Sequence, residues 1–299
     1  MNLFKQTGSK TKKRQPLRRR SNWYIYLITF ASTSIMLGLF VLALSPILFA
    51  QNNTAHKDWR NYYPDSELDT IVLFMLSSEQ GGIPHRFMLM NYRPRDNVIE
   101  LVPLSENTHV QTRAMTGSLI NVYRTGGADL VMEGIKTTLG VECEFHVKFD
   151  RVSFTSLTAG LGDITVNIIK DFESGGVLLK AGEHQLSGGD LFVYMTYVTA
   201  DDELAVMGRA MTFMINYNLR NMDEESISMN FNRVLNNAAT NLEFKNYVNY
   251  YVALHYTSNN SINPASFFVP IYEQEDGALV MTESSINAIH DRFNIITTS

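Results

Sequence analysis

Short apolar runs separated by polar turns recur along the chain and predict a series of β-strands. Residues 70–76 form a continuous apolar run of strand length, as expected for a central strand that is covered on both faces. Two further runs, 86–92 and 98–104, are joined by the polar segment 93–97, which predicts a hairpin. Further strands are predicted at 145–149 and 163–168, where apolar and polar residues alternate.

Helical spacing of apolar residues alternates with these strands. The segment 128–139 carries an apolar face and ends before Gly140, which predicts a helix with a glycine stop. Asp150 is placed to cap a second helix, which carries Phe154, Leu157 and Leu161. More helices are predicted at 206–220, 241–256 and 283–293, and turns at the glycine pairs 81–82, 126–127, 175–176 and 188–189. Alternating strands and helices predict an α/β domain, a layered α-β-α unit around a mixed sheet.

A different pattern precedes this domain. The 27 residues from Trp23 to Phe49 contain no charge, and a helix of that length reaches about 40 Å, which exceeds a hydrocarbon core of about 30 Å. A cleaved signal peptide is the competing interpretation, but its apolar core is shorter. We therefore predict a basic cytoplasmic tail at 1–22, a transmembrane helix at 23–50, an extracytoplasmic stalk at 51–68 and a domain at 69–299.

Charge supports this orientation and excludes one class of partner. The formal net charge is −5, but residues 1–50 hold eight cations and no acid, so the remaining 249 residues carry 17 cations against 30 acids, a net of −13. Cations before the span place the N-terminus in the cytoplasm and the C-terminal domain outside the cell membrane. An acidic domain lacks the cationic face that nucleic acid requires, so we predict no nucleic-acid partner.

Motifs for common chemistries are absent from the sequence. The single cysteine, Cys143, excludes an intramolecular disulfide and a multi-cysteine zinc site. It lies between Glu142 and Glu144, which raise the pKa of a thiol, so we favour a packing role over a nucleophilic one. The seven histidines form no metal-binding pair, the glycine pairs precede no Walker lysine, and no hydrolase elbow occurs. We therefore predict no resident metal or cofactor from motifs alone.

The order of several segments carries a stronger signal. The succession comprises 69–76, 99–104, 119–127, 163–167, 170–172, 179–189, Tyr194, the 203–204 helix start with Arg209, 240–242 and 286–293. In this order the segments resemble the LytR-CpsA-Psr family over about residues 69–294. A basic tail and one span before such a domain are also similar to that family.

The resemblance implies an extracytoplasmic phosphotransferase of Gram-positive envelopes, which moves a glycopolymer from a polyprenyl-pyrophosphate carrier to peptidoglycan or a related acceptor. It also implies a hydrophobic groove for the prenyl tail, with arginines that hold the pyrophosphate and carboxylates that hold a divalent metal such as Mg²⁺. That arrangement is physically reasonable, since phosphoryl transfer needs cations on the equatorial and leaving oxygens.

The sequence departs from the family pattern at almost every charged position. An ungapped comparison places Ser77, Glu79, His85, Glu106, Asn107, Thr196, Val198 and Val206 where the family has charged side chains or its Asp-Thr pair. Arg209 and Asn121 are retained, and together with Arg124 they are the candidate phosphate-binding remnants; we assign no catalytic residue. Arg86 follows His85 on a predicted strand, so we expect it to point to the opposite face. The alternative is a local misalignment, with the charges one or two residues away.

Electrostatics decides between the functions. A glutamate in place of an arginine about 5 Å from a phosphate oxygen changes the interaction by about 6 kcal/mol at an effective dielectric constant of 20. We therefore predict a membrane-anchored protein that binds polyprenyl-linked lipid with catalysis lost or much reduced, with active paralogues as further partners. An active phosphotransferase that uses Mg²⁺ is the alternative, and a sensor that signals through the anchor is a third hypothesis.

Overall fold

The computed structural model describes residues 63–78, 81–159, 163–197, 203–221, 223–260 and 263–295. These residues belong to one compact unit, Asn61–Ser299. The predicted tail, transmembrane helix and most of the predicted stalk lie outside the described residues, so those three assignments stay predictions. Among the residues that are described, no helix has the length and apolar character needed to cross a membrane.

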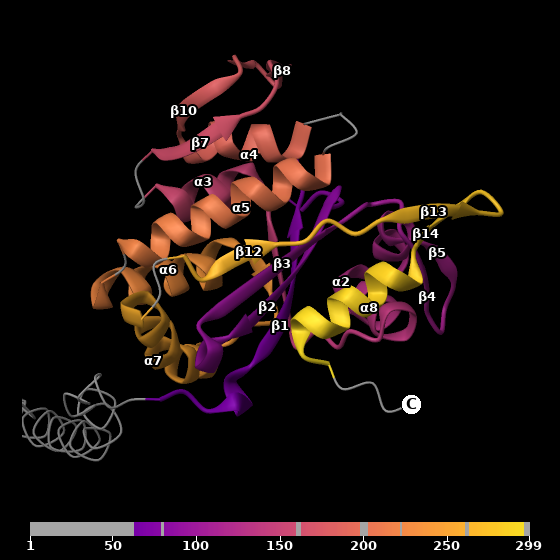
Figure 1. The fold of residues 1–299 in the computed structure, drawn as a ribbon, viewed down its shortest axis with the longest axis horizontal. Helices are drawn as coiled ribbons and strands as arrows, with labels where there is room; N and C mark the ends of the chain where they lie inside the picture. Colours follow the sequence, from indigo (N-terminus) through magenta and orange to yellow (C-terminus); the bar gives the residue numbers. More distant parts are fainter. Residues whose placement is uncertain are drawn as a thin grey trace, which may run out of the picture. The chain divides into compact units, whose positions relative to one another are not determined.

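A six-stranded mixed sheet lies at the centre of the unit, in the order β11-β6-β1-β2-β3-β12 (Figure 1). The strands are β1 (Thr70–Leu76), β2 (Arg86–Arg93), β3 (Val98–Leu104), β6 (Phe145–Phe149), β11 (Ala239–Thr240) and β12 (Ala265–Phe267). β1, β2 and β3 are antiparallel neighbours, whereas β6 pairs with β1 and β12 with β3 in parallel. The predicted mixed sheet and the predicted hairpin are therefore confirmed.

Each face of the sheet is covered by helices, which gives three layers. Alternate residues of β1 point to opposite faces, so that Phe74 and Leu76 enter one core while Leu73 and Met75 enter the other. The first face is covered by α3 (Arg151–Thr158), α4 (Gly188–Tyr197), α5 (Glu203–Arg220), α6 (Glu224–Asn237) and α7 (Phe244–Asn260). The second face is covered by α2 (Leu119–Leu139) and α8 (Glu283–Phe293).

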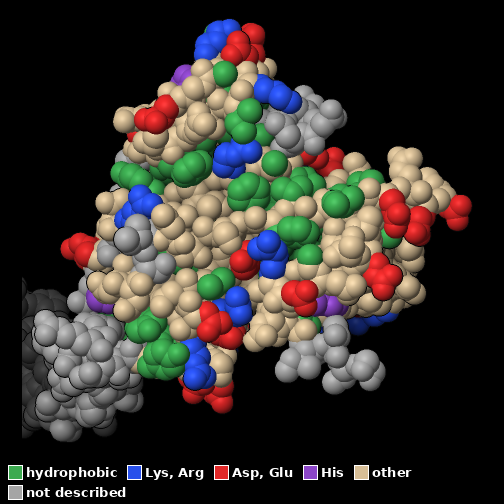
Figure 2. Space-filling model, viewed as in Figure 1, with side chains coloured by type: hydrophobic (Ala, Val, Ile, Leu, Met, Phe, Trp, Pro, Cys, Tyr) green, Lys and Arg blue, Asp and Glu red, His purple; other side chains and the backbone are tan. Residues whose placement is uncertain are grey.

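Short strands and turns surround the three layers. They form the two-stranded sheets β4 (His109–Gln111) with β5 (Thr116–Ser118), β7 (Ile164–Ile168) with β10 (Gly182–Leu186), β8 (Phe172–Ser174) with β9 (Val177–Leu179), and β13 (Tyr272–Glu275) with β14 (Ala278–Met281). Two 3-10 turns, η2 (Ser66–Leu68) and η3 (Pro94–Asp96), precede β1 and connect β2 to β3. Acidic side chains gather at the tip of the β13–β14 hairpin (Figure 2).

Local signals explain the helix ends that the sequence predicted. Asp150 caps α3, since its Oδ1 accepts from the Ser153 N–H at 2.8 Å while its own N–H donates to the Ser153 hydroxyl at 2.9 Å. Gly140 ends α2 with φ 68°, a conformation that glycine adopts without strain. The α2 helix begins nine residues earlier than predicted and is interrupted at 126–127, where Gly127 has φ 67°.

One predicted turn is wrong. The pair Gly188–Gly189 begins α4 rather than forming a turn, because α4 packs closely on α3 at this point. A Cβ on Gly188 would overlap the Thr158 hydroxyl, whereas one on Gly189 would have only ordinary contacts. Glycine at 188 therefore serves close helix packing instead of chain reversal.

Candidate functional site

The structure gathers several of the predicted site positions at one end of the central sheet, and it closes three of them off from solvent. Ser77 follows β1 with 0% of its surface exposed, and its N–H donates to the Phe149 carbonyl at 2.9 Å. Thr196 is buried in α4 and donates its hydroxyl to the Phe192 carbonyl at 2.7 Å. Val206 belongs to the core under α5. None of these three side chains is placed to meet an anionic ligand.

Arg86, at the start of β2, is the central charge at this end of the sheet. Its side chain is 9% exposed, and its Nη2 lies 3.2 Å from the Glu203 Oε2 at the start of α5. Its Nε donates to the Met195 carbonyl at 3.3 Å and its Nη1 to the His85 carbonyl at 3.0 Å. The guanidinium is thus held by protein groups on three sides, which leaves little of it for a phosphate.

Glu106 lies near the Arg86–Glu203 ion pair, and both charges shift the pKa of its carboxyl. It is half-buried, and burial raises the pKa of its carboxyl. Arg86 and Arg124 oppose that rise, while Glu203 adds to it. The expectation that Arg86 and His85 point to opposite faces stays a prediction, but the Arg86 charge does reach Glu106. Two arginines and two glutamates share this region, which we call the mouth.

Three further residues of the mouth, His85, Tyr272 and Asn107, carry no charge at pH 7. Burial, followed by the nearby Arg86 charge, lowers the pKa of His85 to about 4, so the imidazole is uncharged at pH 7. The Tyr272 hydroxyl accepts from the Ser105 N–H at 3.2 Å, and burial raises the pKa of this phenol. Asn107 is exposed and donates its N–H to the Ser105 hydroxyl at 3.3 Å.

Two of the three candidate phosphate-binding residues contact each other, and the third lies on another helix. Arg124 and Asn121 are exposed on the first turns of α2, where Arg124 Nη1 donates to Asn121 Oδ1 at 3.2 Å. Arg209 lies on α5 six residues after Glu203, about 240° around the helix. Its side chain therefore faces a different direction from that of Glu203. Within the described ranges its Nη1 is enclosed without a hydrogen-bond partner.

Sequence reasoning missed two members of the mouth. Glu203 was noticed only as the first residue of a helix, and Tyr272 carries no local signal because it approaches Ser105 from 167 positions further along the chain. Two predicted positions, Glu79 and Val198, lie outside the described residues. Cys143 follows its prediction, since burial and then Glu142 raise the pKa of its thiol to about 12.

The donor set of the mouth does not fit a divalent cation. The described residues contain no group of three histidine, cysteine or carboxylate side chains that could hold a metal ion. The buried Ser77 hydroxyl and the His85 imidazole stand where the sequence comparison predicts carboxylates in the family, and the Glu203 carboxylate is engaged by Arg86.

Comparison with known proteins identifies the fold and the family. The sequence profile of the LytR_cpsA_psr family matches residues 84–294. The polyisoprenyl-teichoic acid–peptidoglycan teichoic acid transferase TagU of Bacillus subtilis is 26% identical over 186 residues, which are 58% of this chain and 60% of TagU. The chain thus spans about three fifths of that relative's length.

Solved structures share the fold at lower identity. A protein from Eubacterium siraeum superposes with a TM-score of 0.70 at 17% identity, covering 81% of this chain and 97% of its own. TagT bound to LI-WTA superposes with a TM-score of 0.59 at 13% identity, covering 79% and 96%. Since the family profile covers most of the chain, this protein belongs to the LytR-CpsA-Psr family.

Proposed function

We propose that this protein is a membrane-anchored, extracytoplasmic member of its family that takes part in cell-envelope assembly. In this role it binds a glycopolymer linked to polyprenyl phosphate or pyrophosphate, with catalysis lost or much reduced. The anchoring rests on the uncharged stretch 23–49 and on the eight cations before it. The single observation that carries the loss of catalysis is the Arg86–Glu203 ion pair with Glu106 beside it.

The charge balance of the mouth supports this proposal. Stabilising a transferring phosphoryl group requires fixed positive charge aimed at its oxygens. Here the positive charges of Arg86 and Arg124 are matched by the negative charges of Glu106 and Glu203. A site of zero net charge can still hold a lipid through its prenyl tail, because burial of apolar surface does not depend on the headgroup.

An active phosphotransferase is the second candidate. The name of the TagU relative, which moves teichoic acid to peptidoglycan, favours it, and so does the presence of two guanidinium groups near Glu106. If this alternative holds, the donor and acceptor are a polyprenyl-linked glycopolymer and peptidoglycan, and Mg²⁺ is the expected cofactor. Active paralogues are the expected partners if the protein only holds the lipid.

One experiment separates these functions. The full-length protein in detergent is mixed with a polyprenyl phosphate and its thermal unfolding is followed, and cleavage of a pyrophosphate-linked lipid is assayed with Mg²⁺ or Mn²⁺ beside active TagU. We expect a rise in the unfolding temperature without turnover. Turnover at a rate similar to that of TagU would establish the phosphotransferase, and no thermal shift would refute the lipid-binding role.

A further inference from the structure

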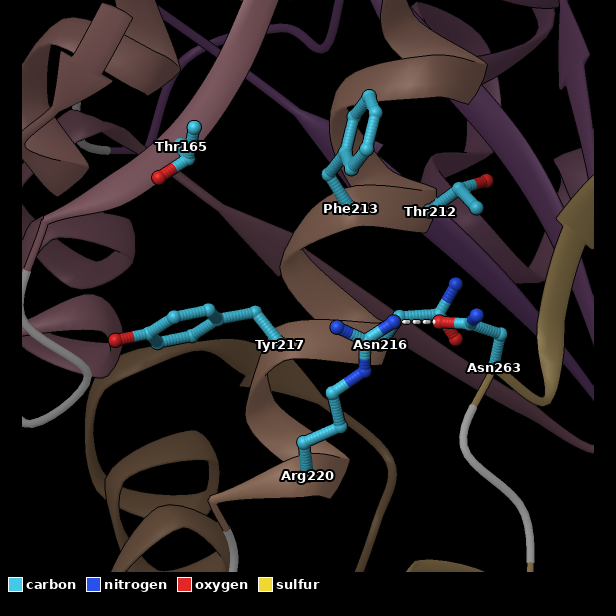
Figure 3. A pocket seen from close by; sticks show the side chains of 7 residues that line it. All are labelled: Thr165, Thr212, Phe213, Asn216, Tyr217, Arg220 and Asn263. Atoms are coloured by element: carbon cyan, nitrogen blue, oxygen red, sulfur yellow. Dashed lines mark hydrogen bonds between the residues drawn. The ribbon is translucent and has the colours of Figure 1, made fainter.

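A groove of about 510 Å³ lies over the C-terminal half of α5, away from the mouth, and its polar groups bind within the protein (Figure 3). Arg220 Nη2 donates to Asn263 Oδ1, and Figure 3 shows the guanidinium turned toward that amide. The Asn216 amide pairs with both backbone groups of Ala265, at 2.9 and 3.1 Å. Because these groups already have partners, we assign no ligand to this groove.

The helices α6 and α7 present a different kind of surface, which we call the aromatic face. Its members on α7 are spaced by three or four residues and therefore share one side of the helix; they are Phe244, Tyr247, Val248 and Tyr251. Phe231 of α6 completes the face, since its ring centroid lies 5.1 Å from that of Tyr247. The Tyr247 centroid also lies 5.6 Å from that of Phe244 and 5.3 Å from that of Tyr251. Four rings and one valine thus form a continuous surface.

Packing of the domain does not account for the aromatic face. α7 already buries another side, where Tyr250, Ala253 and Leu254 contact the first core. The two sides are centred about 120° apart around the helix. Neither core of the described domain includes a member of the aromatic face, and Phe244 and Val248 expose 53% and 51% of their surface. The helix therefore has an apolar side that the described residues leave uncovered.

Charge distinguishes this part of the surface from the rest of the domain. Residues 226–260, which hold both helices apart from the acidic start of α6, contain only three charged side chains: Arg233, Glu243 and Lys245. The one acid is paired, because Glu243 Oε2 lies 2.8 Å from Lys245 Nζ. Two cations and one acid give this stretch a net charge of +1, whereas residues 51–299 carry −13. An anionic lipid surface repels an acidic domain, so contact is least opposed at a face that lacks unpaired acids.

The course of the chain links α7 to the predicted anchor. The first described residue packs on this helix, since the Tyr63 ring centroid lies 6.2 Å from that of Tyr256, and the Arg95 guanidinium lies 5.1 Å from the Tyr63 centroid. The predicted transmembrane helix ends at Ala50, thirteen residues earlier, and thirteen residues reach at most about 45 Å. A tether of this length raises the effective concentration of lipid at α7, so that weak contacts suffice for docking.

We propose that the aromatic face lies on the lipid headgroup region of the membrane and orients the domain there. Phenylalanine and tyrosine suit this environment, because their rings enter the acyl boundary while tyrosine hydroxyls stay hydrated. The exposed fractions leave roughly 350 Å² of the face accessible, less than half of the ~800 Å² per partner that a stable dimer buries, which disfavours a second copy. The inference rests on the proposed anchoring for the nearness of the lipid.

The test uses the full-length protein in vesicles of phosphatidylcholine and phosphatidylglycerol that contain a lipid with a doxyl quencher near its headgroup. A bimane label is attached at Val248→Cys in the aromatic face or at Leu178→Cys, an exposed apolar position of β9. Figure 1 shows α7 and the β8–β9 hairpin at opposite ends of the domain. The unmutated protein is the labelling blank, because burial raises the pKa of the Cys143 thiol to about 12. We expect quenching at 248 to exceed that at 178 by about threefold or more.

Two aspartate substitutions test whether the aromatic face itself holds the domain on the lipid. Phe244 is the first residue of α7 and is exposed, so aspartate suits this helix start while it adds a charge to the face. Phe244→Asp should lower the quenching of the 248 label about threefold or more, since apolar area is lost and a charge opposes docking. Val152→Asp is the matched control, because Val152 is exposed at the start of α3, and it should leave the quenching unchanged.

Several outcomes would overturn the proposal. Equal quenching of the two labels, or unchanged quenching in Phe244→Asp, would show that the face does not meet the lipid. In detergent, a shift of the 248 emission with protein concentration would assign the face to a second copy, and a shift on adding polyprenyl phosphate would assign it to a prenyl chain. Flotation of the vesicles checks the anchoring separately. A protein that floats without quenching at 248 refutes the docking alone, whereas a protein that does not float refutes the anchoring and the docking together.

Discussion

The balance of charges at the mouth predicts that removing its two carboxylates will strengthen the binding of a prenyl pyrophosphate. Replacing Glu106 and Glu203 together by glutamine removes two negative charges while it keeps side-chain size and hydrogen-bonding capacity. The Arg86 guanidinium, which is held 3.2 Å from Glu203 Oε2 in the wild type, then keeps its charge without a carboxylate partner. We expect the double variant to bind a prenyl pyrophosphate more tightly than the wild-type protein does.

The size of the effect follows from the geometry. A carboxylate about 5 Å from a phosphate oxygen repels it by roughly 3 kcal/mol at an effective dielectric constant of 20. Glu203 keeps 32% of its side chain exposed and Glu106 is half-buried, so solvent screening reduces this to about 1 kcal/mol for each glutamate. Together the two substitutions should raise the affinity about thirtyfold.

Calorimetric titration with farnesyl pyrophosphate measures this gain. Glu225→Gln is the control, because it removes the same charge from the exposed surface of α6. The gain should shrink as salt is added, since exposed charges are screened over about 10 Å at 0.1 M. An unchanged affinity in the double variant, or an equal gain in Glu225→Gln, would refute the electrostatic reasoning. Glu106→Gln alone, which breaks no ion pair, repeats the test should the double variant unfold.

Three further predictions concern folding and pH. Gly188→Ala should lower the unfolding temperature by several degrees, because the added Cβ overlaps the Thr158 hydroxyl. Gly189→Ala should leave the unfolding temperature nearly unchanged. Equal effects of the two substitutions would contradict the packing of α4 on α3. Asp150→Ala removes the cap of α3 and should cost about 1 kcal/mol in chemical denaturation, and no loss would show that the cap contributes nothing. His85 has a folded pKa near 4, below its unfolded value of 6.5, so the unfolded state binds more protons between these limits. As pH drops from 6.5 to 4, the stability of the wild type should therefore fall by roughly 1–2 kcal/mol relative to that of His85→Gln, a value that allows for the partly exposed ring. Parallel pH profiles of stability for the two proteins would contradict this prediction.

Strand positions followed from the sequence because burial on both faces leaves an unambiguous pattern. The run at β1 was predicted with its exact ends, and so were β6 and α8, whose flanking residues carry clear turn or cap signals. The helices α4 and α6 escaped prediction. α4 is almost entirely apolar and starts with two glycines, so it shows no amphipathic stripe. α6 does carry apolar residues at helical spacing after Asp223, namely Ile227, Phe231, Val234 and Leu235, and the sequence prediction missed this signal.

The site was less predictable because it depends on contacts between distant segments. The sequence predicted which charged positions of the family had changed, which stays a prediction, but it did not predict that Arg86 would reach Glu203 over 117 positions. The reasoning about opposite faces assumed that His85 lies within the strand, whereas β2 begins at Arg86. A residue before a strand need not follow its alternation, so the strand pattern alone did not fix the direction of Arg86 relative to His85.

The short edge strands of the central sheet affect how copies of the protein can associate. β11 has two residues and β12 has three, so each edge of this sheet offers few backbone groups to a strand from another molecule. Among the described residues, the long strands β1, β2 and β3 are all enclosed by neighbours on both sides. At high local concentration, this resists edge-to-edge polymerisation and directs any association to side-chain surfaces.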